Sequence, residues 1–207
     1  MKKLLTIIIA IAIAAPFFTA CKKGENDPMS LKSRKARLIG EWELVEWEKT
    51  ETTTTTSGAD IITYNFSGSS LSRTSSGTTT IYMYSESNEI MKDGTYNFES
   101  SQTNTEASTT TMIDSEGTWA WVAGNKEDDL KNKERVCFTT TRSTTTSGSS
   151  SSITTDDGDK DVSIIRIDNL GSKELVLVVE ETYTYPSLYD GTTVTVTIEE
   201  TKTYEKK

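Results

Sequence analysis

The stretch LIGEWELVEW, residues 38–47, decides the fold that we predict for this chain. Trp42 and Leu44 stand two residues apart, so on an extended strand their side chains point to one face, while Glu41 and Glu43 point to the other. This alternation of apolar and charged residues indicates a β-strand with one buried face. The overlapping segment LKSRKARLIG, residues 31–40, predicts a short helical turn that caps one end of the sheet.

The same period of two recurs along the rest of the chain, where turn signals such as Asp93-Gly94 and Asp157-Gly158 separate the apolar runs. This spacing predicts an all-β domain, an antiparallel meander of about eight to ten strands. The residues that share a strand face are Tyr82 and Tyr84, Tyr96 and Phe98, Trp119 and Trp121, Leu175 with Leu177 and Val179, and Val194 with Val196 and Ile198.

Leu, Ile, Val and Phe are scarce in this chain, a composition that is also typical of disordered proteins. Threonine is abundant, however, and its β-branched side chain packs well on a pleated sheet. The Thr- and Ser-rich runs at 50–57, 107–111 and 139–155 are flanked by apolar strand residues. We therefore expect long hairpins that project past the body of the sheet, rather than disordered low-complexity segments.

The N-terminus carries export signals. A basic MKK precedes an apolar run at residues 4–15, which is the length of a signal peptide and short for an uncleaved membrane anchor. The sequence FTAC, residues 18–21, resembles the bacterial lipobox, with Phe18 where leucine is usual. We expect cleavage after a signal peptide of residues 1–20, a fatty acyl anchor such as palmitate on Cys21, a flexible tether at 21–35, and a β-domain at 36–207.

The residues after Cys21 indicate where the protein is delivered. Lys22 and Lys23 stand where an aspartate would resemble the signal that retains lipoproteins in the inner membrane. The sequence CKKGEND, residues 21–27, resembles a signal for export to the cell surface. We expect the protein to be anchored in the outer membrane and to face outward.

Charge and residue types exclude several function classes. Removing residues 1–20 takes away two lysines and no acid, so the mature chain has 20 basic and 31 acidic residues and a net charge of −11. Nucleic acid is therefore not expected as a partner. Histidine is absent from the sequence, which removes imidazole general bases and metal ligands, so we expect neither an enzyme nor a cofactor. Cys137 is expected to act as a small core residue.

Clusters of acidic or mixed charge could be read as functional sites, but the sequence favours ordinary surface roles for them. The loop DDGDKD, residues 156–161, offers oxygen ligands for Ca²⁺, but its spacing fails the EF-hand pattern and favours a solvated turn. Residues 126–134 form a mixed-charge loop that favours a solvated surface over a docking site. Glu180-Glu181 and Glu199-Glu200 do not suit a glycosidase, because neighbours on a strand face opposite sides.

Several motifs in order resemble a known family. The helical turn that runs into Gly40-x-Trp42 is followed by MKDGTYNF at 91–98, EGTWAWVAGNK at 116–126, LKNKE at 130–134, IRIDNLGSKELVLVVEE at 165–181 and a terminal TKTYEKK. Behind a lipoprotein signal, this series resembles the small lipocalin-like lipoproteins of Bacteroidetes. The resemblance implies a β-barrel that Trp42 plugs at one end, with Gly40 permitting close approach of the chain. It departs from the family in its long Thr/Ser hairpins. An immunoglobulin-like sandwich is the alternative fold, although the paired cysteines are missing.

Two functions remain open at this point. In the first, the barrel mouth opposite Trp42 binds a small apolar or amphipathic molecule through an aromatic patch. In the second, the barrel is solid, and the protein is an adhesin-like or accessory structural lipoprotein that acts through its Thr-rich hairpins. The large residues on the inward faces favour a small or absent cavity. The residues expected in the patch are Tyr82, Tyr84, Tyr96 and Phe98.

Overall fold

The computed structural model describes residues 33–122, 134–155, 161–187 and 191–207. These form one short helix, α2 (Arg34–Leu38), and eleven strands. The strands are β1 (Gly40–Thr55), β2 (Gly58–Ser67), β3 (Ser70–Ser75), β4 (Thr78–Ile90), β5 (Thr95–Asn104), β6 (Thr109–Val122), β7 (Glu134–Ser147), β8 (Ser150–Thr155), β9 (Asp161–Leu170), β10 (Glu174–Pro186) and β11 (Thr193–Lys206).

Several predicted features lie outside the described residues. They are the signal peptide at 1–20, the lipidation site Cys21, most of the tether, most of the charged loop at 126–134, and the acidic turn at 156–160. At the described start of the chain, helix α2 begins at Arg34, so it includes the last two residues that we assigned to the tether.

The strands form one antiparallel sheet that closes on itself. Neighbours follow the order β6-β5-β4-β3-β2-β1-β11-β10-β9-β7, and a further pairing of β6 with β7 joins the two ends of this series. Strand β8 pairs with the outer part of β7 and stays outside the closed barrel. The predicted all-β, antiparallel, lipocalin-like barrel is confirmed, and the sandwich alternative is wrong because the sheet closes through β6 and β7.

The barrel has fewer strands at the helix end than at its mouth. At the helix end, Gly40–Glu43 of β1 pair directly with Ser87–Ile90 of β4, so eight strands complete the circuit. Farther along β1, the hairpin of β2 and β3 inserts between β1 and β4 and raises the number to ten. Because the diameter of a barrel grows with its number of strands, the helix end is narrow and the mouth is wide.

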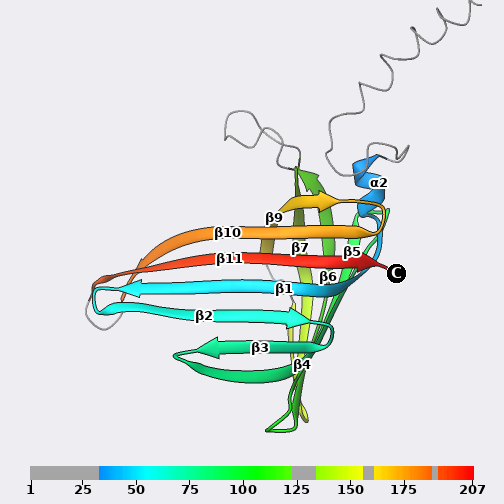
Figure 1. The fold of residues 1–207 in the computed structure, drawn as a ribbon. Coiled ribbons are helices and arrows are strands. Elements are labelled where there is room, and N and C mark those ends of the chain that lie inside the picture. The colour runs from blue at the N-terminus through cyan, green and yellow to red at the C-terminus, as the bar shows by residue number, and fades with distance from the viewer. Residues whose placement is uncertain (1–32, 123–133, 156–160, 188–190) are drawn as a thin grey trace, which may run out of the picture.

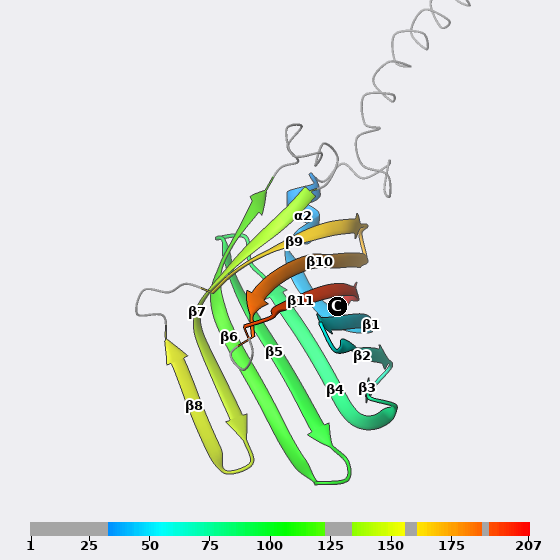
Figure 2. The ribbon, with the colours of Figure 1, turned by 90° about the vertical axis from the view of Figure 1, so that its left-hand side faces the viewer.

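Beyond the barrel, long strands continue as two projecting arms (Figures 1 and 2). Arm A consists of the outer parts of β1, β2, β10 and β11, and arm B of the outer parts of β5, β6 and β7 with β8. The Thr/Ser runs at 50–57, 107–111 and 139–155 lie in the hairpins of these arms, as the sequence predicted. Hydroxyl pairs link neighbouring strands, as between the Oγ1 atoms of Thr103 and Thr110 at 2.9 Å.

Helix α2 and Trp42 close the narrow end. The Ser33 side chain accepts a hydrogen bond from the Ala36 backbone and begins the helix. Trp42 is fully buried, and its Nε1 donates to the Leu38 carbonyl at 2.7 Å. Lys206 Nζ lies 4.7 Å from the centre of the Trp42 ring and donates to the carbonyl of Arg37 at 2.8 Å. The C-terminal strand therefore fastens the helix over the tryptophan.

Gly40 allows this arrangement. Its φ of +139° is rarely adopted by other residues, and a Cβ at this position would collide with the end of the Lys206 side chain. The close approach that the resemblance implied for Gly40 is thus made by a side chain of the last strand.

Candidate functional site

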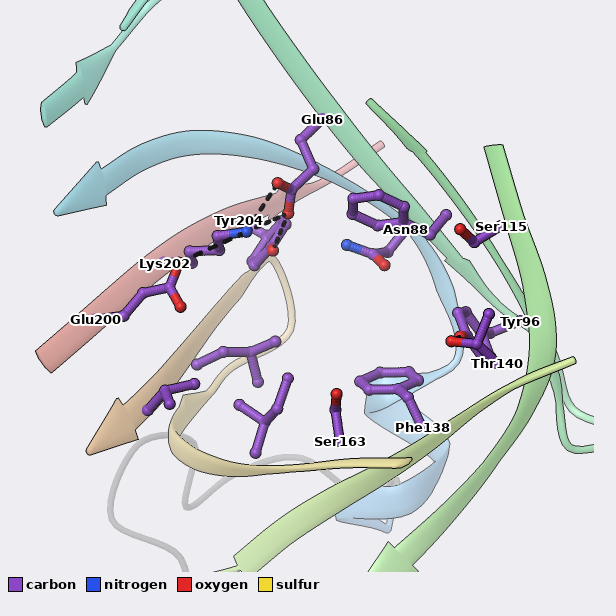
Figure 3. Close-up of a pocket in the computed structure, with 14 residues that line it drawn as sticks. Glu86, Asn88, Tyr96, Ser115, Phe138, Thr140, Ser163, Glu200, Lys202 and Tyr204 are labelled. Atoms are coloured by element: carbon purple, nitrogen blue, oxygen red, sulfur yellow. Dashed lines mark hydrogen bonds and ion pairs between the residues drawn. The ribbon is translucent and has the colours of Figure 1, made fainter. Parts of the chain in front are cut away.

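The barrel lumen contains a cavity of about 260 Å³ beyond the Trp42 plug (Figure 3). Its walls come from seven strands, β4 to β7 and β9 to β11. The lining residues are Glu86, Asn88, Tyr96, Phe98, Ser115, Phe138, Thr140, Ser163, Ile165, Leu177, Val179, Glu200, Lys202 and Tyr204.

Small residues on the inner face of β6 leave space in the lumen. Gly117 is buried where β6 meets Thr139 and Thr140 of β7, and a Cβ on it would collide with the Thr139 carbonyl and lie 2.8 Å from the Tyr96 ring. The Tyr96 ring can therefore lie close to β6, and it makes an edge-type contact with the Phe138 ring, with their centres 4.9 Å apart. Ser115, two residues before Gly117 and on the same face of β6, also lines the cavity.

Glu86 is the centre of a buried polar cluster on one wall. Its side chain is 1% exposed, and its carboxylate accepts hydrogen bonds from the Tyr84 hydroxyl at 2.6 Å and from the Tyr204 hydroxyl. Lys202 Nζ donates to both carboxylate oxygens, at 2.8 Å and 3.1 Å. Four hydrogen bonds from three donor groups thus satisfy a carboxylate that would otherwise be costly to bury.

The two tyrosines in this cluster remain protonated donors. Burial raises the pKa of Tyr204 well above its ordinary value, and the negative charge of Glu86 raises it further. Burial and Glu86 raise the pKa of Tyr84 in the same way. Deprotonation of either phenol would place a second negative charge against the Glu86 carboxylate. The cluster is therefore a fixed network of donors around one buried anion.

A second carboxylate lies beside this network. Glu200 Oε1 is 3.8 Å from Lys202 Nζ, and the Glu200 side chain is 19% exposed, so it is less enclosed than Glu86. Lys49 faces Glu200 across the pairing of β1 and β11, but its Nζ lies 3.2 Å from Glu51 and above the Tyr64 ring. Lys202 is consequently shared by two carboxylates.

The four residues predicted to form an aromatic patch are not brought together. Tyr96 and Phe98 line the cavity, whereas Tyr82 and Tyr84 do not. The register of the β4–β5 hairpin is the reason, because it places Tyr82 opposite Asn104 and Tyr84 opposite Gln102. Tyr84 packs against Trp47 and Phe66, and Tyr82 is half-buried against the core. The register therefore keeps these two residues out of the cavity that Tyr96 and Phe98 line, and their part in ligand binding stays a prediction.

The sequence reasoning missed Glu86 and Lys202. Period two, continued from Tyr82 and Tyr84, places Glu86 on the inward face of β4, so a charged residue at a core position was the available signal. Lys202 had a similar signal: it is a charged residue on the same strand face as Val194 and Val196 of β11.

Two other residues bear on the predicted core. Trp119 is buried and donates from Nε1 to the Met91 carbonyl at 2.8 Å, while Trp121 on the same face is half-buried against the core. Cys137 is only half-buried and points away from its core neighbours Val136 and Phe138, so its assignment to the core is wrong.

Comparison with known proteins gives no family. No protein-family model, curated protein or solved structure matches this chain. Within the described residues, no helix is long and apolar enough to cross a membrane, and no group of three or more His, Cys, Asp or Glu side chains is placed to hold a metal ion. The candidate site is the lumen, where apolar and charged side chains line one cavity.

Proposed function

We propose that this protein is an outer-membrane lipoprotein, anchored through an acylated Cys21 and facing outward, whose non-catalytic lipocalin-like barrel binds a compact amphipathic molecule. The observation that carries the binding proposal is the lumenal cavity, which combines apolar surface from Phe98, Phe138 and Leu177 with a polar part around Lys202. Binding sites for small molecules combine apolar surface with a few placed polar groups in this way.

The volume of the cavity limits the ligand. Pockets for drug-sized molecules occupy about 300–1,000 Å³, so a cavity of about 260 Å³ is smaller than that range. A cavity of about 150 Å³ accepts benzene. The lumen therefore has room for one ring with a short substituent, and a bile acid or a heme is too large to be enclosed.

Filling the cavity should abolish binding. Ser115 lines the lumen, and Ser115→Phe adds an aromatic ring to that space. We expect wild-type protein to bind a one-ring probe such as 2-phenylethanol in isothermal titration calorimetry, and Ser115→Phe to lose at least about ten-fold in affinity because the ring occupies the site. Thr118→Phe, which adds the same ring at an exposed position on the opposite face of β6, is the control.

Native mass spectrometry of protein purified from its own cells extends this test to the natural ligand. Absence of any bound species, together with no heat of binding from one-ring probes in the wild type, would contradict the lumenal function. A Ser115→Phe variant that binds as well as Thr118→Phe would place the ligand outside the lumen.

Lipid anchoring is predicted separately from ligand binding. We expect mass spectrometry of the mature N-terminus to find Cys21 as residue one, carrying acyl chains, and the protein to fractionate with the outer membrane. Cys21→Ala should leave it unprocessed at that site. Protease treatment of intact cells should release the domain if it faces outward. A Cys21→Ala protein that still loses residues 1–20 and fractionates with membrane would contradict the anchor.

A second candidate is an adhesin-like or accessory role of the arms. The observation in its favour is that large apolar side chains are exposed on the arms, where Ile61 of arm A and Met112 and Ile153 of arm B are each about half exposed. Exposed apolar residues in projecting segments are typical of contact surfaces. Replacing all three by threonine should abolish surface attachment if this role is correct and leave it unchanged if the lumen carries the function.

A further inference from the structure

We infer that the lumenal ligand is a compact organic cation, with one ring in the aromatic part of the cavity and an ammonium-type group at the carboxylate of Glu200. This inference rests on the lumenal function proposed above and names its ligand class. It depends on how the charges on the polar wall are distributed.

Glu86 is already fully paired. Its carboxylate offers about four acceptor sites, and the tyrosine hydroxyls and Lys202 Nζ supply four hydrogen bonds to them. With a side chain that is 1% exposed, Glu86 has no remaining surface for a ligand. Its role is to hold Lys202 in place.

Lys202 cannot neutralise Glu200 at the same time. Its Nζ lies 2.8 Å from Glu86 and 3.8 Å from Glu200, so the shorter, hydrogen-bonded contacts are made with Glu86. Two carboxylates share one ammonium, and the cavity wall has a net charge of −1. Glu200 is the carboxylate with acceptor capacity left toward the cavity that it lines.

The neighbouring charges do not reverse this balance. Lys49 lies opposite Glu200 across β1 and β11, and its Nζ pairs with Glu51 at 3.2 Å. Arg73 donates from Nε to the Tyr64 hydroxyl at 3.2 Å. Glu181, two positions beyond Val179 on the same face of β10, adds further negative charge toward the mouth. The whole chain is also acidic, with a net charge of −9, which favours the approach of cations.

The shape of the cavity separates the ring from the charge. Glu86, Glu200 and Lys202 project from β4 and β11 on one side, and the rings of Tyr96 and Phe138 project from β5 and β7 on the other (Figure 3). A molecule with a ring at one end and an ammonium at the other spans these two walls. A carboxylate ligand would have to draw Lys202 away from Glu86 and leave a buried charge unpaired, which is strongly unfavourable.

A series of three one-ring ligands tests this inference on the wild-type protein. The probes are 2-phenylethylamine, 2-phenylethanol and 3-phenylpropionate, which present a cation, a neutral hydroxyl and an anion on similar one-ring bodies. We expect calorimetry at pH 7 and low salt to show the amine binding at least about five-fold more tightly than the alcohol, and the acid most weakly. The advantage of the amine should shrink as salt is added, because ions screen the charge at the open mouth.

Two matched variants locate the charge. Glu200→Gln should reduce the preference for the amine over the alcohol to within about two-fold while leaving the affinity for the alcohol unchanged. Glu199→Gln removes the same charge one residue away, at an exposed position on the outer face of β11, and should keep the preference. Circular dichroism and thermal melting of both variants verify that each is folded.

Each outcome is decisive. Equal binding of the amine and the alcohol by the wild type would overturn the cation inference and leave the lumenal function standing. Equal effects of Glu199→Gln and Glu200→Gln would overturn it as well, because the preference would then come from overall charge. Binding of none of the three probes would overturn both proposals.

Discussion

Trp42→Ala will lower the free energy of unfolding by about 3–5 kcal/mol, the cost typical of truncating a large core residue. Trp42 is 0% exposed and fills the narrow end of the barrel, so its removal leaves a cavity that the eight surrounding strands cannot collapse to fill. The change also deletes the hydrogen bond from Nε1 to the Leu38 carbonyl that holds helix α2. Urea unfolding followed by circular dichroism measures this loss.

A domain of this size loses about 2–4 °C of melting temperature for each kcal/mol, so the expected decrease is about 6–20 °C. Trp121→Ala is the matched control, because Trp121 is half-buried near the end of β6, and its truncation should cost clearly less. If the two substitutions cost the same, or if Trp42→Ala is nearly silent, Trp42 is not the plug of the barrel.

Glu86→Ala will destabilise the protein by a similar amount, about 3–5 kcal/mol, for an electrostatic reason. Removing the carboxylate takes the acceptor away from Tyr84, Tyr204 and Lys202 together, and it leaves the Lys202 ammonium without its hydrogen-bonded counter-ion. The loss is measured by the same urea unfolding experiment. Glu86→Gln keeps the shape and part of the hydrogen bonding, so it should lie between the wild type and alanine.

Glu89→Ala provides the control for this prediction, since Glu89 is an exposed residue on the same strand whose carboxylate accepts one hydrogen bond, from Asn97 at 3.1 Å. Surface substitutions of this kind usually change stability by less than about 0.5 kcal/mol. A Glu86→Ala variant as stable as Glu89→Ala would mean that the buried cluster contributes little to the folded state.

Much of the fold could be predicted because its signals are local. Trp42 and Leu44 on the first strand, and the Thr/Ser runs flanked by apolar residues, gave the strands and the long hairpins. The candidate site was predicted only in part. Tyr96 and Phe98 line the cavity. The residues of β4 that lie opposite them are Ile90 and Asn88, so Tyr84 and Tyr82 are each six positions too early in the strand to join them.

Bulges also limit prediction from alternation. The register between β1 and β11 shifts between Leu44 and Glu46, which returns Trp47 to the inner face, opposite Lys202. Strict alternation from Leu44 would have assigned Trp47 to the outside. A single inserted residue therefore places Trp47 beside the polar cluster. The bulge is visible only in the pairing of β1 with β11.

By itself the sequence determined that this chain forms antiparallel strands, and which side chains share a face between one bulge and the next, because that alternation follows from the geometry of each extended segment. The tertiary structure decided which strands, and therefore which side chains, those faces contact. Glu86 and Lys202 are 116 positions apart in the chain and come into contact only because the sheet closes on itself. The closure of the sheet depends on long-range pairing between strands, of β1 with β11 and of β1 with β4, so that pairing also decided the volume and the charge of the lumen.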